Sequence, residues 1–258
     1  MSNKGLTVLI TGANRGLGLE FVKQYAEYGS RVIATCRTPF AADELNTLSA
    51  AQENVTVDVL DVSIPASVGA LAERYDGTPI DILLNNAALL APTPAQAFGQ
   101  INYDVFVQSF LVNALGPIKM CEAFVEHVAA SEEKKIVTLG SAAGSIAMHR
   151  APANLYSYRS SKAALHSLMH NLSIDLADRG IKVGLLNPGL ADTRGLLDLE
   201  PDDPGPEDLR HVVALARQGI IEITPVDLAV RGMIGIIDGL TEDQAGHFLN
   251  FDGVEIPW

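Results

Sequence analysis

Short apolar runs alternate with segments of helical length along most of this chain, and this alternation constrains the fold more than any other feature. Most of the runs are continuously apolar, which is typical of strands that helices cover on both faces. Strand–helix–strand repeats of this kind require a parallel sheet with right-handed crossovers. The predicted strands are Leu6–Ile10, Arg31–Thr35, Val55–Leu60, Asp81–Asn85, Lys135–Leu139, Lys182–Leu186 and His247–Leu249.

The segments between these runs have the length and amphipathic pattern of helices. The chain therefore predicts a single α/β domain over residues 1–258, built as a doubly wound parallel sheet of about seven strands. One stretch, Leu199–Asp208, is rich in proline and acidic residues and fits neither a helix interior nor a strand. We expect a loop there. The predicted helices are Leu17–Tyr28, Ala41–Ala50, Ser67–Tyr75, Tyr103–Ala130, Tyr156–Arg179 and Val226–Asp238.

The composition excludes several classes of function. The chain has 31 acidic residues against 18 lysines and arginines, so its formal net charge is −13. Nucleic acid and anionic membranes need a basic surface, so neither is expected as a partner. The apolar runs are too short for a signal peptide or a membrane span, and Cys36 and Cys121 have no metal-ligand or disulfide spacing. We therefore expect a cytoplasmic protein without a metal site.

A glycine-rich turn follows the first predicted strand and leads directly into a helix. Its sequence, TGANRGLG (Thr11–Gly18), has the spacing G-x-x-x-G-x-G in place of the more familiar G-x-G-x-x-G. Glycines let the backbone turn sharply and approach a ligand, and the helix N-terminus offers N–H groups to a pyrophosphate. This position in the chain predicts a Rossmann-type dinucleotide site. The expected cofactor-binding residues of the turn are Gly12, Asn14, Arg15, Gly16, Leu17 and Gly18.

The end of the second predicted strand indicates which dinucleotide binds. In dinucleotide-binding folds an acidic residue there binds the ribose 2′-hydroxyl of NAD, whereas arginine accepts the 2′-phosphate of NADP. This chain has Cys36 at that position, followed by Arg37, and Arg15 lies within the glycine turn. We therefore expect NADP(H) in preference to NAD(H), with Arg37 as a cofactor contact. The alternative is that both arginines are ordinary solvated surface residues.

Tyr158 and Lys162 are four residues apart at the start of a long predicted helix, so both side chains lie on one helical face. A free tyrosine has a pKa of about 10, which is high for an acid–base group at neutral pH. A neighbouring ammonium group favours the phenolate and lowers that pKa. The pair therefore predicts a proton-transfer site, although the same spacing also occurs on ordinary helix surfaces.

Together, the glycine turn and the Tyr158–Lys162 pair resemble the short-chain dehydrogenase/reductase family, and the resemblance extends over nearly the whole chain. The long stretch between Ser141 and Tyr158 and the C-terminal sequence narrow it to the C-factor and sniffer-type branch, which is associated with carbonyl reductase activity. Ala88 departs from the glycine that is usual in the family. The further matching segments, in the family's order, are Asn85-Asn86-Ala87-Ala88, Asn113, Ser141 and Asn187-Pro188-Gly189.

The resemblance implies a role for each matching residue. Tyr158 would protonate the developing alkoxide during carbonyl reduction, and Lys162 would lower the pKa of Tyr158 and hydrogen-bond the nicotinamide ribose. Ser141 would donate to the substrate oxygen, and Asn113 would hold a water in the proton path. The remaining cofactor contacts would be Asp61 and Val62 at the adenine, Asn85 and Ala87 along the cleft, Pro188, Gly189 and Thr193 at the nicotinamide, and Tyr158 and Lys162 themselves.

Several of these residues also have simpler interpretations. Asp61 could cap a turn or a helix, and Asn113 could mark a helix kink. Ser141 could be a strand-end turn residue, and Ser145 is its rival because it stands at the family's commoner distance from the tyrosine. We prefer Ser141 because it lies at the end of a predicted strand.

The expected function is reversible hydride transfer between NADP(H) and a small-molecule carbonyl compound or secondary alcohol. A segment at about residues 191–218 would cover the substrate. His149 and Arg150, in the long extra loop between Ser141 and Tyr158, are candidates to face it, although the simpler interpretation of each is a solvated loop side chain. Two alternatives remain open: a cofactor-binding signalling or sensor protein with little turnover, and an NAD-linked alcohol dehydrogenase. Family members commonly pair through the helices equivalent to Tyr103–Ala130 and Tyr156–Arg179, which implies a homodimer or homotetramer.

Overall fold

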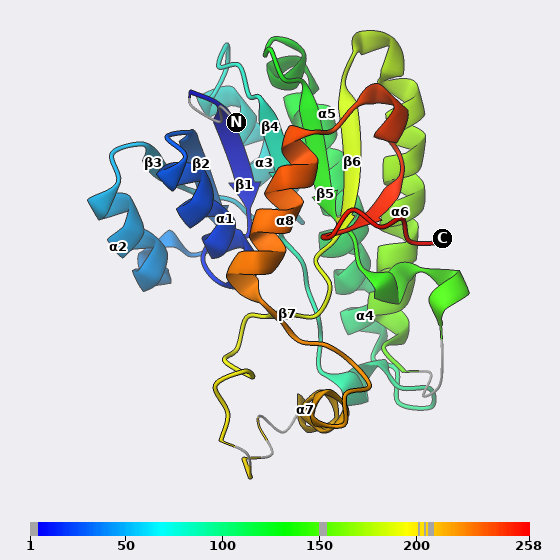
Figure 1. Cartoon of the computed structure of the whole chain (residues 1–258). Helices are drawn as coiled ribbons and strands as arrows, with labels where there is room; N and C mark the ends of the chain where they lie inside the picture. The colour runs from blue at the N-terminus through cyan, green and yellow to red at the C-terminus, as the bar shows by residue number, and fades with distance from the viewer. Residues whose placement is uncertain (1–4, 150–153, 201, 204, 206–208) are drawn as a thin grey trace.

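A central parallel sheet with helices on both faces forms the architecture, as Figure 1 shows. The computed structural model describes residues 5–149, 154–200, 202–203, 205 and 209–258. Seven strands pair in the order β3-β2-β1-β4-β5-β6-β9, and every neighbouring pair is parallel. They are β1 (Thr7–Thr11), β2 (Arg31–Cys36), β3 (Val55–Val59), β4 (Ile82–Asn85), β5 (Lys135–Leu139), β6 (Lys182–Asn187) and β9 (Phe248–Asn250).

Helices connect the strands and cover both faces of the sheet (Figure 1). In the described part of the chain, none of them is both long enough and apolar enough to cross a membrane. They are α1 (Gly16–Glu27), α2 (Asp43–Ala51), α3 (Pro65–Arg74), α4 (Tyr103–Phe110), α5 (Gly116–Ala129), α6 (Tyr156–Asp175), α7 (Arg210–Arg217) and α8 (Val226–Asp238).

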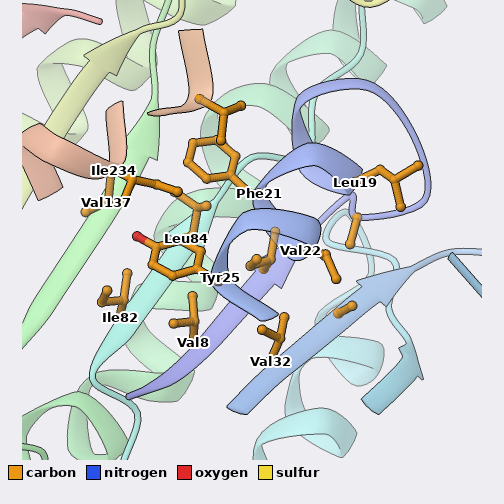
Figure 2. Packing of buried hydrophobic residues seen from close by; sticks show 14 of the residues in the cluster. Val8, Leu19, Phe21, Val22, Tyr25, Val32, Ile82, Leu84, Val137 and Ile234 are labelled. Atoms are coloured by element: carbon orange, nitrogen blue, oxygen red, sulfur yellow. The ribbon is translucent and has the colours of Figure 1, made fainter. Parts of the chain in front are cut away.

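The sheet carries a separate hydrophobic core on each face. Successive residues of β1 divide between the two cores: Val8 and Ile10 pack with α1, α2 and α8, whereas Leu9 packs with α3, α5 and α6. Figure 2 shows the first core, in which Phe21 and Tyr25 of α1 lie over the sheet. Burial on both faces explains why the strands are continuously apolar in sequence.

The predicted fold class is confirmed, and all seven predicted strands are present with ends shifted by at most one residue. The predicted helix Tyr103–Ala130 is two helices, α4 and α5, joined by a π-helical turn at Leu111–Leu115. The predicted helix Tyr156–Arg179 ends at Asp175, and a short 3₁₀ turn follows it. A helical hydrophobic period continues through such local changes in winding, so the sequence did not indicate them.

The segment at residues 191–218 contains structure on both sides of the loop that the sequence predicted at Leu199–Asp208. Strand β7 (Ala191–Asp192) pairs with β8 (Thr224–Pro225), and α7 lies between them in the chain. The helix was not predicted, because its apolar pattern is only eight residues long and follows a proline-rich stretch. Residues 201, 204 and 206–208 of the expected loop lie outside the described residues.

The order of the strands determines where a ligand can bind. It reverses at β1, which has β2 on one side and β4 on the other. Ligands of open α/β sheets bind beyond the carboxyl ends of the strands at such a switch point. The glycine turn follows β1, and the other predicted motifs follow β4, β5 and β6, so all of them lie at this one edge of the sheet.

Candidate active site

The glycine turn packs directly against the segment that follows β4. Gly12 has a φ of +67°, and an added Cβ would lie 2.8 Å from the Cα atom of Ala87. At Gly18 an added Cβ would overlap the carbonyl oxygen of Gly12. The Asn86 side-chain amide donates to the carbonyl oxygens of Thr11, at 2.7 Å, and Gly12, at 2.9 Å. The turn therefore has no room for a side chain at these glycines, and its backbone is held to the end of β4.

The N-terminus of α1 is suited to binding an anion. Arg15 occupies the N-cap position with an extended backbone, and among the described residues no side chain caps this helix. The first turn of α1 also lacks an acidic residue. Because the first N–H groups of a helix carry partial positive charge, this end can bind a phosphate group. Asn14 and Leu17 are partly buried beside it.

Two arginines lie close to this end of the sheet. The backbone N–H of Ala13 donates to the carbonyl oxygen of Thr35 at 2.9 Å, so the glycine turn adjoins the end of β2. Cys36, the last residue of β2, is buried, whereas Arg37 and Arg15 are exposed. In the part of the chain that the structure describes, neither arginine takes part in an ion pair. Both guanidinium groups are thus available to a phosphate.

Asn85 does not face the glycine turn with its side chain. It is 3% exposed, and its Nδ2 lies 3.5 Å from Cys121 Sγ and 3.4 Å from Thr138 Oγ1. Successive residues of an extended segment point to opposite sides, which is why Asn86 reaches the turn and Asn85 faces the core. The cofactor contact of Asn85 stays a prediction, and Asn86 is a supporting residue that the sequence prediction did not include. Ala88 is not in the left-handed region of φ, so the family's glycine can be replaced there without strain.

Asp61 and Val62 have structural partners of their own. Asp61 Oδ1 accepts from the backbone N–H of Ser63 at 2.9 Å and from its hydroxyl at 2.6 Å, so the carboxylate caps a turn. Val62 is buried, and an added Cβ at Gly116 would lie 2.9 Å from its Cγ2. The cap interpretation of Asp61 therefore holds, and the adenine contact of both residues stays a prediction.

The segment after β6 returns over the glycine turn. An added Cβ at Gly16 would lie 3.3 Å from the Cβ of Thr193, so Thr193 lies directly against the turn. Gly189 has a φ of +67°, and an added Cβ would lie 2.9 Å from the ring of Phe251. Pro188 and Gly189 are partly exposed at this point. The end of β2, the segment after β4 and the segment after β6 are far apart in sequence, and all three contact the glycine turn.

Asp192, which the sequence prediction did not single out, organises the start of this returning segment. Its carboxylate accepts backbone N–H groups from Arg194 at 3.1 Å, Leu196 at 2.9 Å and Leu197 at 2.8 Å. Partial burial raises the pKa of Asp192, but these bonds outweigh that effect and lower the pKa below its ordinary value. An ionised carboxylate therefore holds the chain that carries Thr193.

Tyr158, Ser141 and Lys162 come together where α6 passes the end of β5. The Tyr158 hydroxyl shares a hydrogen bond with the side chain of Ser141. The Lys162 ammonium donates to the carbonyl oxygen of Leu139 at 2.8 Å and lies 5.9 Å from the centre of the Tyr158 ring. Lys162 is only 3% exposed. A phenol, a hydroxyl and a buried cation therefore share one site, as the sequence predicted for these residues.

Burial sets the protonation of this group. Burial raises the pKa of the Tyr158 phenol, and the hydrogen bond with Ser141 lowers it only in part. Burial also lowers the pKa of Lys162 to about 8. The lowering of the Tyr158 pKa that we expected from Lys162 is not seen, because the ammonium binds the carbonyl of Leu139 in place of the phenol oxygen. The phenol is therefore protonated at neutral pH, as a proton donor must be.

Replacing Lys162 with methionine should stabilise the protein at neutral pH. Because burial lowers the lysine pKa, the folded state binds its proton less tightly than the unfolded state, and the stability cost is fully present below pH 8. We expect the free energy of unfolding to rise by about 1–3 kcal/mol at pH 7, allowing for the lost bond to Leu139. This gain should shrink above pH 8 and vanish above the pKa of an unfolded lysine. Urea denaturation at pH 7 and pH 10 measures it, and an unchanged or lower stability at pH 7 would contradict the argument.

The structure places Ser141, and not Ser145, beside Tyr158. Ser145 is fully buried, and its hydroxyl donates to the carbonyl oxygen of Pro257. The backbone N–H of Ser141 donates to His166 Nε2 at 3.3 Å. Burial lowers the pKa of His166 to about 3, so this imidazole is neutral and can accept that bond. His166, like Asn86 and Asp192, is a supporting residue that the sequence prediction missed.

The extra loop between β5 and α6 is held by its own contacts and by the C-terminal residues. His149 Nε2 lies 2.9 Å from the carbonyl oxygen of Ala143, which closes the loop on itself. The backbone N–H of Ala147 donates to the carbonyl oxygen of Trp258 at 2.9 Å. Arg150, the other predicted substrate-facing residue, lies outside the described residues.

Asn113 lies fully buried in the π-helical turn between α4 and α5. Its Oδ1 accepts from the backbone N–H of Leu89 at 2.6 Å, and its Nδ2 donates to the carbonyl oxygen of Leu89 at 2.9 Å and to Ser161 Oγ at 3.0 Å. The amide thus ties the segment after β4 to α6. Asn113 lies where the helix changes its winding, in agreement with the kink interpretation. Its role in holding a water stays a prediction.

These residues fit a nicotinamide dinucleotide. The glycine turn is a backbone cradle that a Cβ would fill, and it leads into an uncapped helix end. Arg15 and Arg37 offer charge for a further phosphate. Tyr158 and Ser141 can protonate or hydrogen-bond a substrate oxygen. Protein side chains supply no hydride, so a hydride transfer at this site would need a bound cofactor.

Comparison with known proteins agrees with this geometry. A family model described as short chain dehydrogenase matches residues 6–203. The C-signal protein of Myxococcus xanthus is 31% identical over 189 residues, which cover 73% of this chain and 99% of that protein. NADPH-bound carbonyl reductase from chicken fatty liver superposes with a TM-score of 0.82 at 28% identity, covering 99% of this chain and 100% of that one. Carbonyl reductase Sniffer of D. melanogaster gives a TM-score of 0.80 at 25% identity, covering 98% and 100%.

Proposed function

This chain belongs to the short-chain dehydrogenase family, and we propose that it transfers hydride between NADP(H) and a carbonyl compound or secondary alcohol. The family, with its carbonyl reductase and sniffer-type relatives, is the one that the sequence indicated. The observation that carries the proposal is the phenol of Tyr158. It is hydrogen-bonded to Ser141, and the buried ammonium of Lys162 lies over its ring, 5.9 Å from the ring centre.

In the direction of reduction, the side chains act on the substrate oxygen. Bound NADPH supplies the hydride for the carbonyl carbon. Ser141 donates a hydrogen bond to the carbonyl oxygen and stabilises the negative charge that develops there. Tyr158 gives its hydroxyl proton to that oxygen and is left as a phenolate. In the reverse direction the Tyr158 phenolate takes the proton of the alcohol.

The choice of NADP(H) rests on the arginines at the adenosine end of the proposed site. The backbone of the glycine turn and the N-terminus of α1 would hold the pyrophosphate. Arg15 and Arg37 would bind the 2′-phosphate, because a guanidinium forms two parallel hydrogen bonds with phosphate oxygens. Cys36 stands where an NAD-binding chain has an acidic residue. The chicken carbonyl reductase, described with NADPH bound, supports this choice.

We also propose that residues 191–218 cover the substrate. The segment leaves the site directly after Gly189, and it carries Thr193 against the glycine turn. Strand β7, at the start of the segment, pairs with β8, which follows the end of the segment, and α7 lies between the two strands in the chain. A segment anchored at both ends beside a ligand site can cover that site without a second domain.

The proposed function predicts NADPH-dependent turnover and a preference that Arg37 controls. A panel of aldehydes and ketones, assayed by loss of NADPH or NADH absorbance, should include substrates that the protein reduces faster with NADPH. In Arg37→Asp we expect the ratio of kcat/KM for NADPH over NADH to fall by about 10- to 100-fold, since the substitution removes a phosphate contact and adds a like charge. Arg31→Asp, at the other end of β2, makes the same charge change away from the site and should leave the ratio unchanged.

The possible failures of this experiment separate the alternatives. Cofactor binding without turnover on any carbonyl would favour a sensor and contradict the proposed reaction. Turnover with a higher kcat/KM for NADH in the unmodified protein would make it an NAD-linked enzyme. A ratio that Arg37→Asp does not alter would show that Arg37 is a solvated surface residue.

A further inference from the structure

The helix that carries Tyr158 begins without a cap of its own. Its N-cap residue, Leu155, has no side-chain acceptor and adopts the left-handed conformation, with φ of +59° and ψ of +38°. This conformation is costly for a non-glycine residue. Tyr158 is the third residue of the helix, so its backbone N–H is one of those that α6 itself leaves without a partner.

A glutamine from a distant segment supplies the missing acceptor. Gln96, at the end of a short 3₁₀ turn (Thr93–Gln96), accepts from the Tyr158 N–H at 2.9 Å and from the Ser157 hydroxyl at 2.7 Å, both through Oε1. Its Nε2 donates to the carbonyl oxygen of Ala91. The donor and acceptor of the amide are therefore each engaged by a partner of the opposite kind, which fixes its orientation. Gln96 is 0% exposed.

The other side of the Tyr158 backbone is held as well. Ser161 Oγ donates to the carbonyl oxygen of Tyr158 at 2.8 Å and accepts from Asn113 Nδ2 at 3.0 Å. Asn113 is in turn bonded to the backbone of Leu89. Both polar backbone atoms of Tyr158 are thus fixed by contacts that lead back to the segment between β4 and α4.

We propose that Gln96 is a positioning residue that holds Tyr158 in reach of the substrate oxygen by capping α6 from the segment between β4 and α4. The proposal rests on the proposed function, because it assigns Gln96 to the proton transfer of Tyr158. Loss of the cap leaves the Tyr158 N–H and the Ser157 hydroxyl without their acceptor in a buried place, so the first turn of α6 must shift or open. A displacement of about 1 Å at a reacting group can reduce a rate by about 10²-fold.

Two substitutions separate capping from packing. Gln96→Leu keeps much of the side-chain shape and removes the acceptor, whereas Gln96→Glu, protonated in this buried place, keeps both an acceptor for Tyr158 and a donor for Ala91. We expect Q96L to lower kcat for carbonyl reduction by about 10- to 100-fold with less than about a threefold change in the Kd of NADPH. Q96E should restore most of kcat. Gln100→Leu is the matched control, because Gln100 is an exposed glutamine of the same segment, and it should behave as wild type.

Hydrogen exchange tests the cap without relying on turnover. The peptide that covers residues 154–162 should exchange faster in Q96L than in wild type, Q96E or Q100L. Wild-type kcat in folded Q96L, or unchanged exchange in this peptide, would overturn the proposal. Should Q96L not fold, Gln96→Asn takes its place, since its shorter amide cannot reach Ala91 and Tyr158 together, and the same two results decide. Absence of turnover in the wild type would instead overturn the proposed function, and the exchange measurement would still test the cap.

Discussion

A Tyr158→Phe variant should lose about 10²- to 10⁴-fold in kcat for carbonyl reduction, which is the usual contribution of a positioned proton donor. The substitution removes only the hydroxyl that is bonded to Ser141 and leaves the ring in place. Burial keeps the phenol protonated at neutral pH, so Tyr158 can donate its proton there. NADPH affinity, measured by quenching of protein fluorescence, should change by less than about threefold, because the lost group handles a proton and leaves the cofactor cradle intact.

Tyr156→Phe is the matched control for this experiment. Tyr156 lies two residues earlier on the same helix and is 39% exposed, with its ring beside that of Phe98. Removing its hydroxyl should leave kcat within about twofold of wild type, as for most surface changes. If Tyr158→Phe retained wild-type turnover, or if both variants lost the same activity, the assignment of Tyr158 as the proton donor would be wrong.

The sheet could be predicted from sequence because each strand carries its own signal. Residues such as Val8, Leu9 and Ile10 are apolar in succession since both faces of β1 are covered, and this pattern needs no knowledge of distant partners. The interruption at Leu111–Leu115 and the helix Arg210–Arg217 were not predicted. The first keeps a helical period through a change of winding, and the second is too short for its period to stand out.

The proposed catalytic and phosphate-binding residues could be located because chain order and spacing place them. Tyr158 and Lys162 share one helix face, and the glycine turn follows the first strand. Their electrostatics could not be read in the same way. Whether Lys162 lowers the Tyr158 pKa depends on where the ammonium hydrogen-bonds, and in the fold it binds the carbonyl of Leu139, which is a property of three-dimensional packing.

Supporting residues were missed because their partners are distant in sequence. Gln96 and Tyr158 are 62 positions apart, and Asn86 and Gly12 are 74 apart. His166 is recognised only when the backbone N–H of Ser141 is seen to donate to it. A glutamine, an asparagine or a histidine has no sequence signature of its own when its role is to satisfy a backbone group elsewhere.

Replacing Gly18 with alanine should abolish tight NADPH binding, with a Kd raised by at least about 100-fold, and should also lower stability. An added Cβ at this position overlaps the carbonyl oxygen of Gly12, and the Asn86 amide that bonds the turn is also in contact range. The obstructing oxygen belongs to the backbone, so only movement of the turn itself can relieve the overlap. That movement breaks the bonds from Asn86 and displaces the N–H groups that would face the pyrophosphate.

The loss of affinity should follow from the position and not from alanine as such, and Gly69 allows this to be tested. Gly69 lies within α3, and an added Cβ there has no neighbouring atom within 4 Å. Gly69→Ala should therefore keep wild-type affinity for NADPH and raise the free energy of unfolding by about 0.5–1 kcal/mol, since alanine is the better helix former. Titration calorimetry and thermal melting of both variants make the comparison. Wild-type NADPH affinity in Gly18→Ala would mean that the turn does not hold the pyrophosphate, and the cofactor would then have to bind elsewhere on the sheet edge.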